Sequence, residues 1–94
     1  GASILITTAA DSYKARKSNQ VLKQFNQSLM SYCQKNGIAS WDLYKITTGH
    51  GSARHWANRG LMNRDRIHFT AEGYRLQGGL LLNALAKGYN NFIQ

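Results

Sequence analysis

The residues best suited to carry chemistry are Asp65 and His68, which stand three positions apart within the run DRIHFTAEGY at residues 65–74. A carboxylate at this spacing can fold back in one turn and accept the Nδ1–H of the imidazole. That bond would fix the tautomer and leave Nε2 free as a general base. The same spacing also fits a structural role, in which Asp65 caps a turn and His68 packs beside Phe69. The two residues alone therefore leave both roles open.

Two further histidines, His50 and His55, raise the question of a metal site. The spacings His50-x4-His55 and His55-x12-His68 match no compact zinc pattern, so we expect no bound metal. The single cysteine, Cys33, excludes an intrachain disulfide. It stands at helical spacing from Leu29 and is predicted to be a buried structural thiol.

Two tryptophans could line a substrate pocket. Trp56 lies in a polar stretch with His55 and Asn58, and we take it as the candidate for a pocket wall. Trp41 stands within an apolar run and is predicted to belong to the core.

A nucleophilic serine is not evident in the chain. None of its serines stands in a GDS or GxSxG context. Ser12 and Ser52 are better explained as residues that cap helices.

The elements that would position these side chains begin with a strand, a helix and a second strand. Residues 2–8 form a short apolar run without a helical stripe, which is typical of a buried parallel strand. Apolar residues recur every three or four positions over residues 14–36, which predicts an amphipathic helix with Asp11 or Ser12 as its N-cap. Residues 38–44 indicate the second strand. The short connections between these segments predict a right-handed βαβ unit.

The rest of the chain combines a long loop with a second long helix. Residues 45–70 are interrupted by glycines and are predicted to be mainly loop, with a short helix over residues 52–58 that Ser52 caps. Residues 71–92 carry a broad apolar face and predict a helix, with Thr70 as its N-cap.

Charge and composition limit the function classes. The 94 residues carry 12 Lys plus Arg against 4 Asp plus Glu, for a net charge of +8. Such an excess suggests nucleic acid or an anionic membrane as a partner. The basic residues are scattered, however, without a contiguous run or an RNA-binding motif, so we do not expect nucleic-acid binding. No apolar run approaches the length of a membrane span, and the start of the chain does not look like a secretory signal.

The predicted topology is that of part of a larger domain. Two parallel strands with two long helices cannot close a sheet covered on both faces, because such sheets normally have four or more strands. We therefore expect residues 1–94 to form either a single small domain or the C-terminal fragment of a larger α/β domain. A fragment of this kind should expose a strand edge and tend to self-associate or swap elements.

The run at residues 65–74, followed by Gln77-Gly78 and a leucine-rich helix, resembles the C-terminal catalytic block of the SGNH hydrolases, also called GDSL-type lipases or esterases. Residues 4–13 (ILITTAADSY), 38–44 (IASWDLY) and 49–56 (GHGSARHW) resemble preceding segments of the family. The resemblance spans nearly the whole chain, and DRIHFTAEGY is its most specific portion.

This resemblance implies a flavodoxin-like three-layer α/β/α fold and the hydrolysis of an ester by a serine, without a metal or other cofactor. His68 would activate the serine, and Asp65 would orient His68. In the family, the nucleophile and the oxyanion-stabilising residues lie N-terminal to the matched region. The isolated chain is therefore expected to be catalytically incomplete and to need the N-terminal half of its domain.

The resulting hypothesis is the C-terminal portion of a serine ester hydrolase that contributes Asp65 and His68. Its substrate would be an ester with a small or medium acyl group on a carbohydrate or lipid, and the resemblance favours a periplasmic or secreted location. Two alternatives remain: a non-catalytic α/β binding or interaction module, and a basic nucleic-acid-binding domain.

Overall fold

The computed structural model describes residues 4–93 of the chain. Ala2 and Ser3, which open the first predicted strand, lie outside the described residues. The elements run in the order β1 (Leu5–Thr7), β2 (Tyr13–Lys14), β3 (Lys17–Ser18), α1 (Gln20–Lys35), β4 (Ala39–Trp41), α2 (Leu43–Ile46), α3 (Ser52–Asn58) and α4 (Ala71–Ile93).

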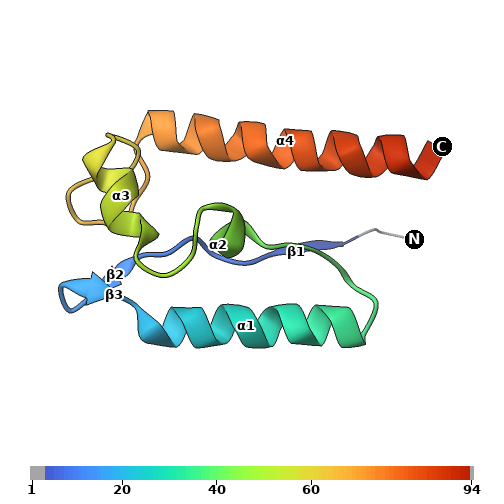
Figure 1. Ribbon diagram of the computed structural model, residues 1–94, viewed down its shortest axis with the longest axis horizontal. Helices are drawn as coiled ribbons and strands as arrows, with labels where there is room; N and C mark the ends of the chain where they lie inside the picture. The colour runs from blue at the N-terminus through green and yellow to red at the C-terminus, as the bar shows by residue number, and fades with distance from the viewer. Residues whose placement is uncertain (1–3, 94) are drawn as a thin grey trace.

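Strand β1 pairs in parallel with β4, with Ile6 opposite Ser40 at the centre of the register. Helix α1 connects the two strands, which confirms the predicted strand–helix–strand unit. Helices α1 and α4 lie on opposite sides of β1 in Figure 1, so the molecule has a helix layer, a strand layer and a second helix layer. The predicted mixed α/β architecture with parallel strands and a long C-terminal helix is confirmed.

The start of the first predicted helix is wrong. Residues 14–19 do not continue α1 but contribute to an antiparallel hairpin of β2 and β3, in which Tyr13 pairs with Ser18. The turn between the strands places Ala15 at φ 53° and Arg16 at φ 67°. Two successive positive φ angles produce the twist that a tight hairpin needs. Because such turns usually contain Gly or Asn, this pair gave no hairpin signal in the sequence.

The predicted N-cap of this helix is also wrong. Helix α1 begins at Gln20, and the side chain of Asn19 accepts the backbone N–H of Leu22 at 3.2 Å. Asn is among the best capping residues because its short side chain reaches the free N–H groups of the first turn. Asp11 and Ser12 lie on the far side of the hairpin and do not cap α1.

Asp11 instead ties the hairpin to the start of α3. Its side chain is 1% exposed, and Oδ2 accepts hydrogen bonds from the hydroxyl of Ser18 at 2.7 Å and from the backbone N–H groups of Gly51 and Ala53 at 3.1 Å each. The bounds predicted for α3 are confirmed, but Ser52 is its first helical residue and not its cap. The sequence predicted that the hydroxyl of Ser52 would cap α3. The carboxylate of Asp11 does so instead, because it accepts N–H groups at the start of that helix.

Helix α1 buries fewer apolar residues than its periodicity suggested. Val21, Phe25 and Tyr32 are exposed, whereas Asn26 and Cys33 are buried. The amide of Asn26 donates to the carbonyl of Ala9 at 2.9 Å and accepts the N–H of the same residue at 3.2 Å, which holds the backbone that follows β1. The prediction that Cys33 is a buried thiol is confirmed.

The core is formed by the end of α1, by β4 and by the segments that follow β4. Its members are buried apolar residues: Cys33, Trp41, Leu43, Tyr44, Ala53 and Met62. The prediction that Trp41 belongs to the core is confirmed. The prediction that the first strand is buried is wrong, since Leu5 is 42% exposed and Ile4 is also exposed. Among the described residues β1 pairs with β4 alone, and a strand with one free edge and thin cover cannot be buried on both faces.

Candidate active site

The Asp65–His68 segment forms a closed loop whose ends are tied together. Met62 and Phe69 form an antiparallel bridge, and the N–H of Asn63 donates to the carbonyl of His68 at 2.8 Å. Within the loop, the N–H of Arg66 donates to the carbonyl of Asn63 at 2.9 Å, with Arg66 itself at φ 56°. These bonds fix the direction in which both functional side chains leave the backbone.

The carboxylate of Asp65 binds His68 through one oxygen and the loop backbone through the other. The imidazole Nδ1–H of His68 donates to Oδ2 at 2.7 Å. Oδ1 accepts the backbone N–H groups of Ile67 at 2.9 Å and His68 at 3.1 Å. The imidazole is therefore oriented with Nδ1 toward the carboxylate, and Nε2 is the nitrogen left to meet a partner. This geometry is the one expected from the three-residue spacing.

The side chains of Asp65 and His68 are both exposed at the surface of the described part of the chain. The side chain of His68 is 68% exposed and that of Asp65 is 43% exposed. The hydrogen bond from the His68 side chain, together with those from the backbone N–H groups of Ile67 and His68, lowers the pKa of Asp65 from 3.8 to about 2. Asp65 therefore stays ionised at any pH at which an imidazole can work as a base, and its negative charge faces the ring.

The low pKa of Asp65 can be checked by titration. A group whose pKa is depressed on folding stabilises the fold fully above its unfolded value, and that contribution is lost as pH falls through the folded value. For Asp65 this window runs from 3.8 down to about 2. Carboxyl ¹³C NMR should give a midpoint near the lower value, and His68→Ala should raise it while leaving it below 3.8, because both backbone N–H groups remain. An unchanged midpoint in His68→Ala would contradict the stated cause.

The start of α4 holds the loop against the preceding segment. Thr70 accepts the N–H of Gly73 at 3.1 Å and donates its hydroxyl to the carbonyl of Gly60 at 2.8 Å, so its predicted role as N-cap is confirmed. A Cβ on Gly73 would lie 1.9 Å from the carbonyl oxygen of Leu61. Only glycine allows α4 to approach the backbone of residue 61 this closely, which explains why the motif needs a glycine there.

Aromatic rings brace the loop from the side of α3. Phe69 packs edge-to-face against Trp56, with centroids 5.4 Å apart, and against Tyr74 at 5.5 Å. This packing supports the residue next to His68. That Trp56 also forms a wall of a substrate pocket stays a prediction.

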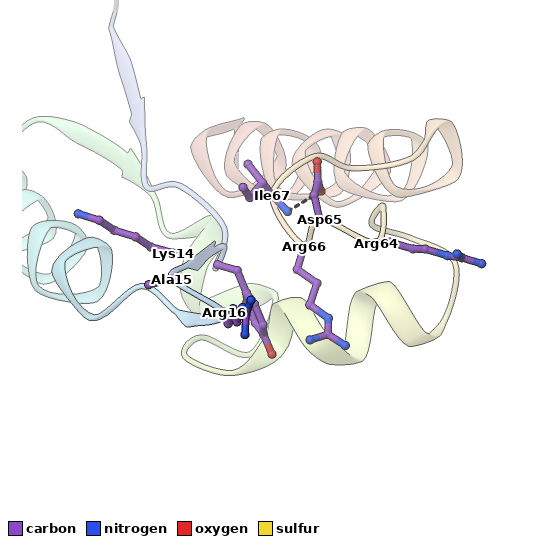
Figure 2. Close-up of a pocket in the computed structure, with 8 residues that line it drawn as sticks. Lys14, Ala15, Arg16, Arg64, Asp65, Arg66 and Ile67 are labelled. Atoms are coloured by element: carbon purple, nitrogen blue, oxygen red, sulfur yellow. Dashed lines mark hydrogen bonds between the residues drawn. The ribbon is translucent and has the colours of Figure 1, made fainter.

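The hairpin forms part of the site, and sequence analysis missed this. The N–H of Tyr13 donates to the carbonyl of Arg66 at 2.9 Å, and the guanidinium carbon of Arg66 lies 4.8 Å from the centre of the Tyr13 ring. Figure 1 shows the hairpin and α3 at the same end of the molecule. Between the hairpin and the loop lies a cavity of about 620 Å³, whose lining residues are drawn in Figure 2.

The other histidines do not join the pair. His50 is exposed in the segment before α3, and His55 is exposed on α3 itself. Within residues 4–93, no three His, Cys, Asp or Glu side chains are grouped so that they could hold a metal ion. No helix in the same part of the chain is both long and apolar enough to cross a lipid bilayer.

No family model and no curated protein matches the sequence. The structure, however, is similar to a solved structure of a peptidoglycan O-acetylesterase, with a TM-score of 0.87 and 25% sequence identity over 96% of this chain. The fold is that of an SGNH hydrolase. The chain spans 27% of the length of that esterase. The resemblance seen in the sequence, and the SGNH-type fold that it implied, are thus confirmed.

Proposed function

We propose that this SGNH-type chain is the C-terminal portion of a serine ester hydrolase and contributes the Asp65–His68 pair to its active site. The observation that carries the proposal is the 2.7 Å hydrogen bond between these side chains, formed just before α4 in a fold that matches an esterase. A carboxylate that orients an imidazole is the arrangement that activates serine nucleophiles on several unrelated folds.

In the proposed mechanism, Nε2 of His68 takes the proton of a serine hydroxyl as its oxygen attacks the ester carbonyl. The imidazolium then protonates the leaving alcohol as the carbon–oxygen bond breaks, which leaves an acyl-enzyme. Water attacks this intermediate, loses a proton to His68, and the acid leaves as the serine regains its proton. Asp65 remains ionised throughout, holds the ring in one tautomer and stabilises its positive form.

The serine and the oxyanion donors are proposed to come from the N-terminal half of the domain. The chain matches only part of the length of the esterase, and β1 has a free edge among the described residues. Apolar side chains beside that edge and on α4 are exposed, namely Ile4, Leu5, Leu76, Leu82 and Leu85. Further strands and helices of the same domain would bury these residues, which gives the hydrophobic gain that would hold the two parts together.

The proposed substrate is an ester of a carbohydrate, with acetate as the acyl group. This choice is supported by the similarity to a peptidoglycan O-acetylesterase. An acetyl group needs little room, so specificity would lie in how the site recognises the alcohol portion of the ester.

Acetate release is the measurement that tests this function. The full-length protein should cleave both 4-nitrophenyl acetate and an O-acetylated polysaccharide, whereas residues 1–94 expressed alone should cleave neither, because covalent catalysis needs the serine. Absence of cleavage by the full-length protein would favour the non-catalytic module. Enzyme-like turnover by the isolated chain would contradict the division of the site between two parts.

A further inference from the structure

The cavity between the hairpin and the Asp65–His68 loop is strongly basic. Four of its eight lining residues are cationic and one is acidic: Lys14, Arg16, Arg64 and Arg66 against Asp65. The lining comes from two segments about fifty positions apart in sequence, namely β2 with the turn that follows it and the loop before α4. Folding thus gathers at one place a part of the positive charge that is scattered along the sequence.

These four cations have no acidic partner among the described residues. Ion pairs there join Asp65 to His68 and Glu72 to Arg75, and neither pair involves a cation of the cavity. Asp65 lines the cavity, but its oxygens already accept the imidazole N–H and two backbone N–H groups. Four positive charges against the one negative charge of Asp65 leave the cavity with a net positive potential. Such a potential attracts anionic groups.

Arg16 and Arg66 are the two cations best placed to act together. In Figure 2 the side chains of Lys14 and Arg64 extend outward on opposite sides, whereas Arg16 and Arg66 lie between them. Arg66 is held over the ring of Tyr13, and the backbone of Tyr13 is hydrogen-bonded to that of Arg66. A guanidinium positioned by an aromatic ring keeps its planar donors available for a ligand.

Both arginines stand at positive φ, 67° for Arg16 and 56° for Arg66. Residues other than Gly, Asn and Asp seldom adopt this conformation. Here the hairpin register and the bond between Tyr13 and Arg66 hold it in place. The backbone therefore presents two guanidinium groups from separate segments to one cavity, which Asp65 also lines.

We propose that this cavity binds an anionic group of the ester substrate, a carboxylate or a phosphate on its alcohol portion, with Arg16 and Arg66 as the recognising residues. The inference rests on the proposed function and adds to it a substrate class, namely acidic carbohydrate esters. Guanidinium groups match such oxyanions because two parallel N–H donors face two oxygens in charge-assisted hydrogen bonds. An anion held by these arginines would lie against the same loop that carries Asp65 and His68.

A nucleic acid is the other polyanion to consider. The cavity volume of about 620 Å³ suits a group of sugar size. A nucleic-acid groove would instead follow the backbone over several nucleotides and combine basic with stacking aromatic residues. The cavity has eight lining residues, and the Tyr13 ring among them is already covered by Arg66. It thus favours a small anionic group over a strand.

Binding to the full-length protein tests the inference without requiring turnover. Calorimetric titration with trigalacturonate, glucose 6-phosphate and neutral galactotriose should show binding of at least one anion and weaker binding of the neutral sugar. Preference between the first two ligands identifies carboxylate or phosphate as the group recognised. Equal affinity for the neutral trisaccharide, or tighter and salt-sensitive binding of a thymidine oligonucleotide, would overturn the proposal.

Variants then locate the site. The double replacement Arg16→Gln and Arg66→Gln should weaken anion binding by about tenfold or more, because two charge-assisted bonds are lost. The matching Arg→Lys pair keeps both charges and should retain part of the affinity. Arg54→Gln, on the exposed surface of α3, removes one charge outside the cavity and should leave anion binding as it was. Equal losses in Arg54→Gln and the double variant would show a general charge effect and overturn the assignment.

Kinetics separate this inference from the proposed function. The ratio of kcat/KM for acetylated polygalacturonate to that for acetylated xylan should fall by about tenfold in the Arg→Gln double variant. An unchanged ratio in an active enzyme that binds no anion would overturn this inference alone. A protein that binds the anions through Arg16 and Arg66 but cleaves no ester would overturn the proposed function and retain the binding site.

Discussion

Replacing His68 by alanine in the full-length protein is expected to lower kcat for ester hydrolysis by about 10⁴-fold or more. The imidazole would be the group that takes the serine proton and returns it to the leaving alcohol, and no other described histidine contacts Asp65. The initial rate of acetate release from 4-nitrophenyl acetate measures the effect. Because the side chain of His68 is 68% exposed, the variant should still fold, as circular dichroism would show.

His50→Ala is the matched control for this variant. It removes another exposed imidazole, from the segment just before α3, that forms no hydrogen bond with Asp65 in the described part of the chain. Its rate should stay close to that of the unsubstituted protein. Full activity in folded His68→Ala would contradict the assignment of His68, and an equal loss in His50→Ala would mean that the effect is not specific to the pair.

Gly73→Ala is expected to destabilise the protein by about 3 kcal/mol, because overpacking against a fixed group forces the backbone to move. The new Cβ would lie 1.9 Å from the carbonyl oxygen of Leu61 and 2.9 Å from the Phe69 ring. The obstacle is mainly backbone, so no change of rotamer relieves it. Separation of α4 from residue 61 would also disturb Phe69, next to His68, and a displacement of about 1 Å at a catalytic group can cost about 100-fold in rate. Urea unfolding and acetate release measure the two effects.

Gly78→Ala, in the same helix, is the control for Gly73→Ala. Apart from the adjacent turns of α4 itself, no atom of the described residues lies within 4 Å of a Cβ built on Gly78, so the methyl group meets open space. Alanine should raise the free energy of unfolding by about 0.5–1 kcal/mol, since it restricts the unfolded chain and favours the helix. Equal stability of the Gly73→Ala and Gly78→Ala variants would contradict the close approach of α4 to Leu61.

Several features of the site could be predicted because they depend on neighbours in the sequence. The Asp65–His68 hydrogen bond forms within one turn, so the spacing of the two residues was sufficient to predict it. Thr70 caps α4 for the same reason, because its hydroxyl reaches an N–H three residues later. The bounds of α3 could also be predicted from local signals. Its cap could not, because the N–H of Ala53 is accepted by the distant carboxylate of Asp11.

The hairpin and the role of Asp11 could not be predicted because their causes are distant in sequence. Asp11 looked like a cap for the next helix, yet its carboxylate accepts N–H groups about forty residues away. Ala15 and Arg16 carry no turn signal, and the conformation they adopt is supported by the contact between Tyr13 and Arg66. The burial of β1 and α1 could not be predicted either, and several of their apolar residues are exposed. Periodicity indicates which face of an element can be buried but not which segment covers that face.

The sequence by itself determined the hydrogen bond between Asp65 and His68, the strand–helix–strand unit and the cap at Thr70, because each is recorded in a local pattern of residues. Only the tertiary structure decided that the hairpin lies against the Asp65–His68 loop and that Arg16 and Arg66 share one cavity. Their meeting depends on hydrogen bonds and packing between segments about fifty positions apart. Interactions at such separation form only when the whole chain has folded, so no local pattern of residue types records them.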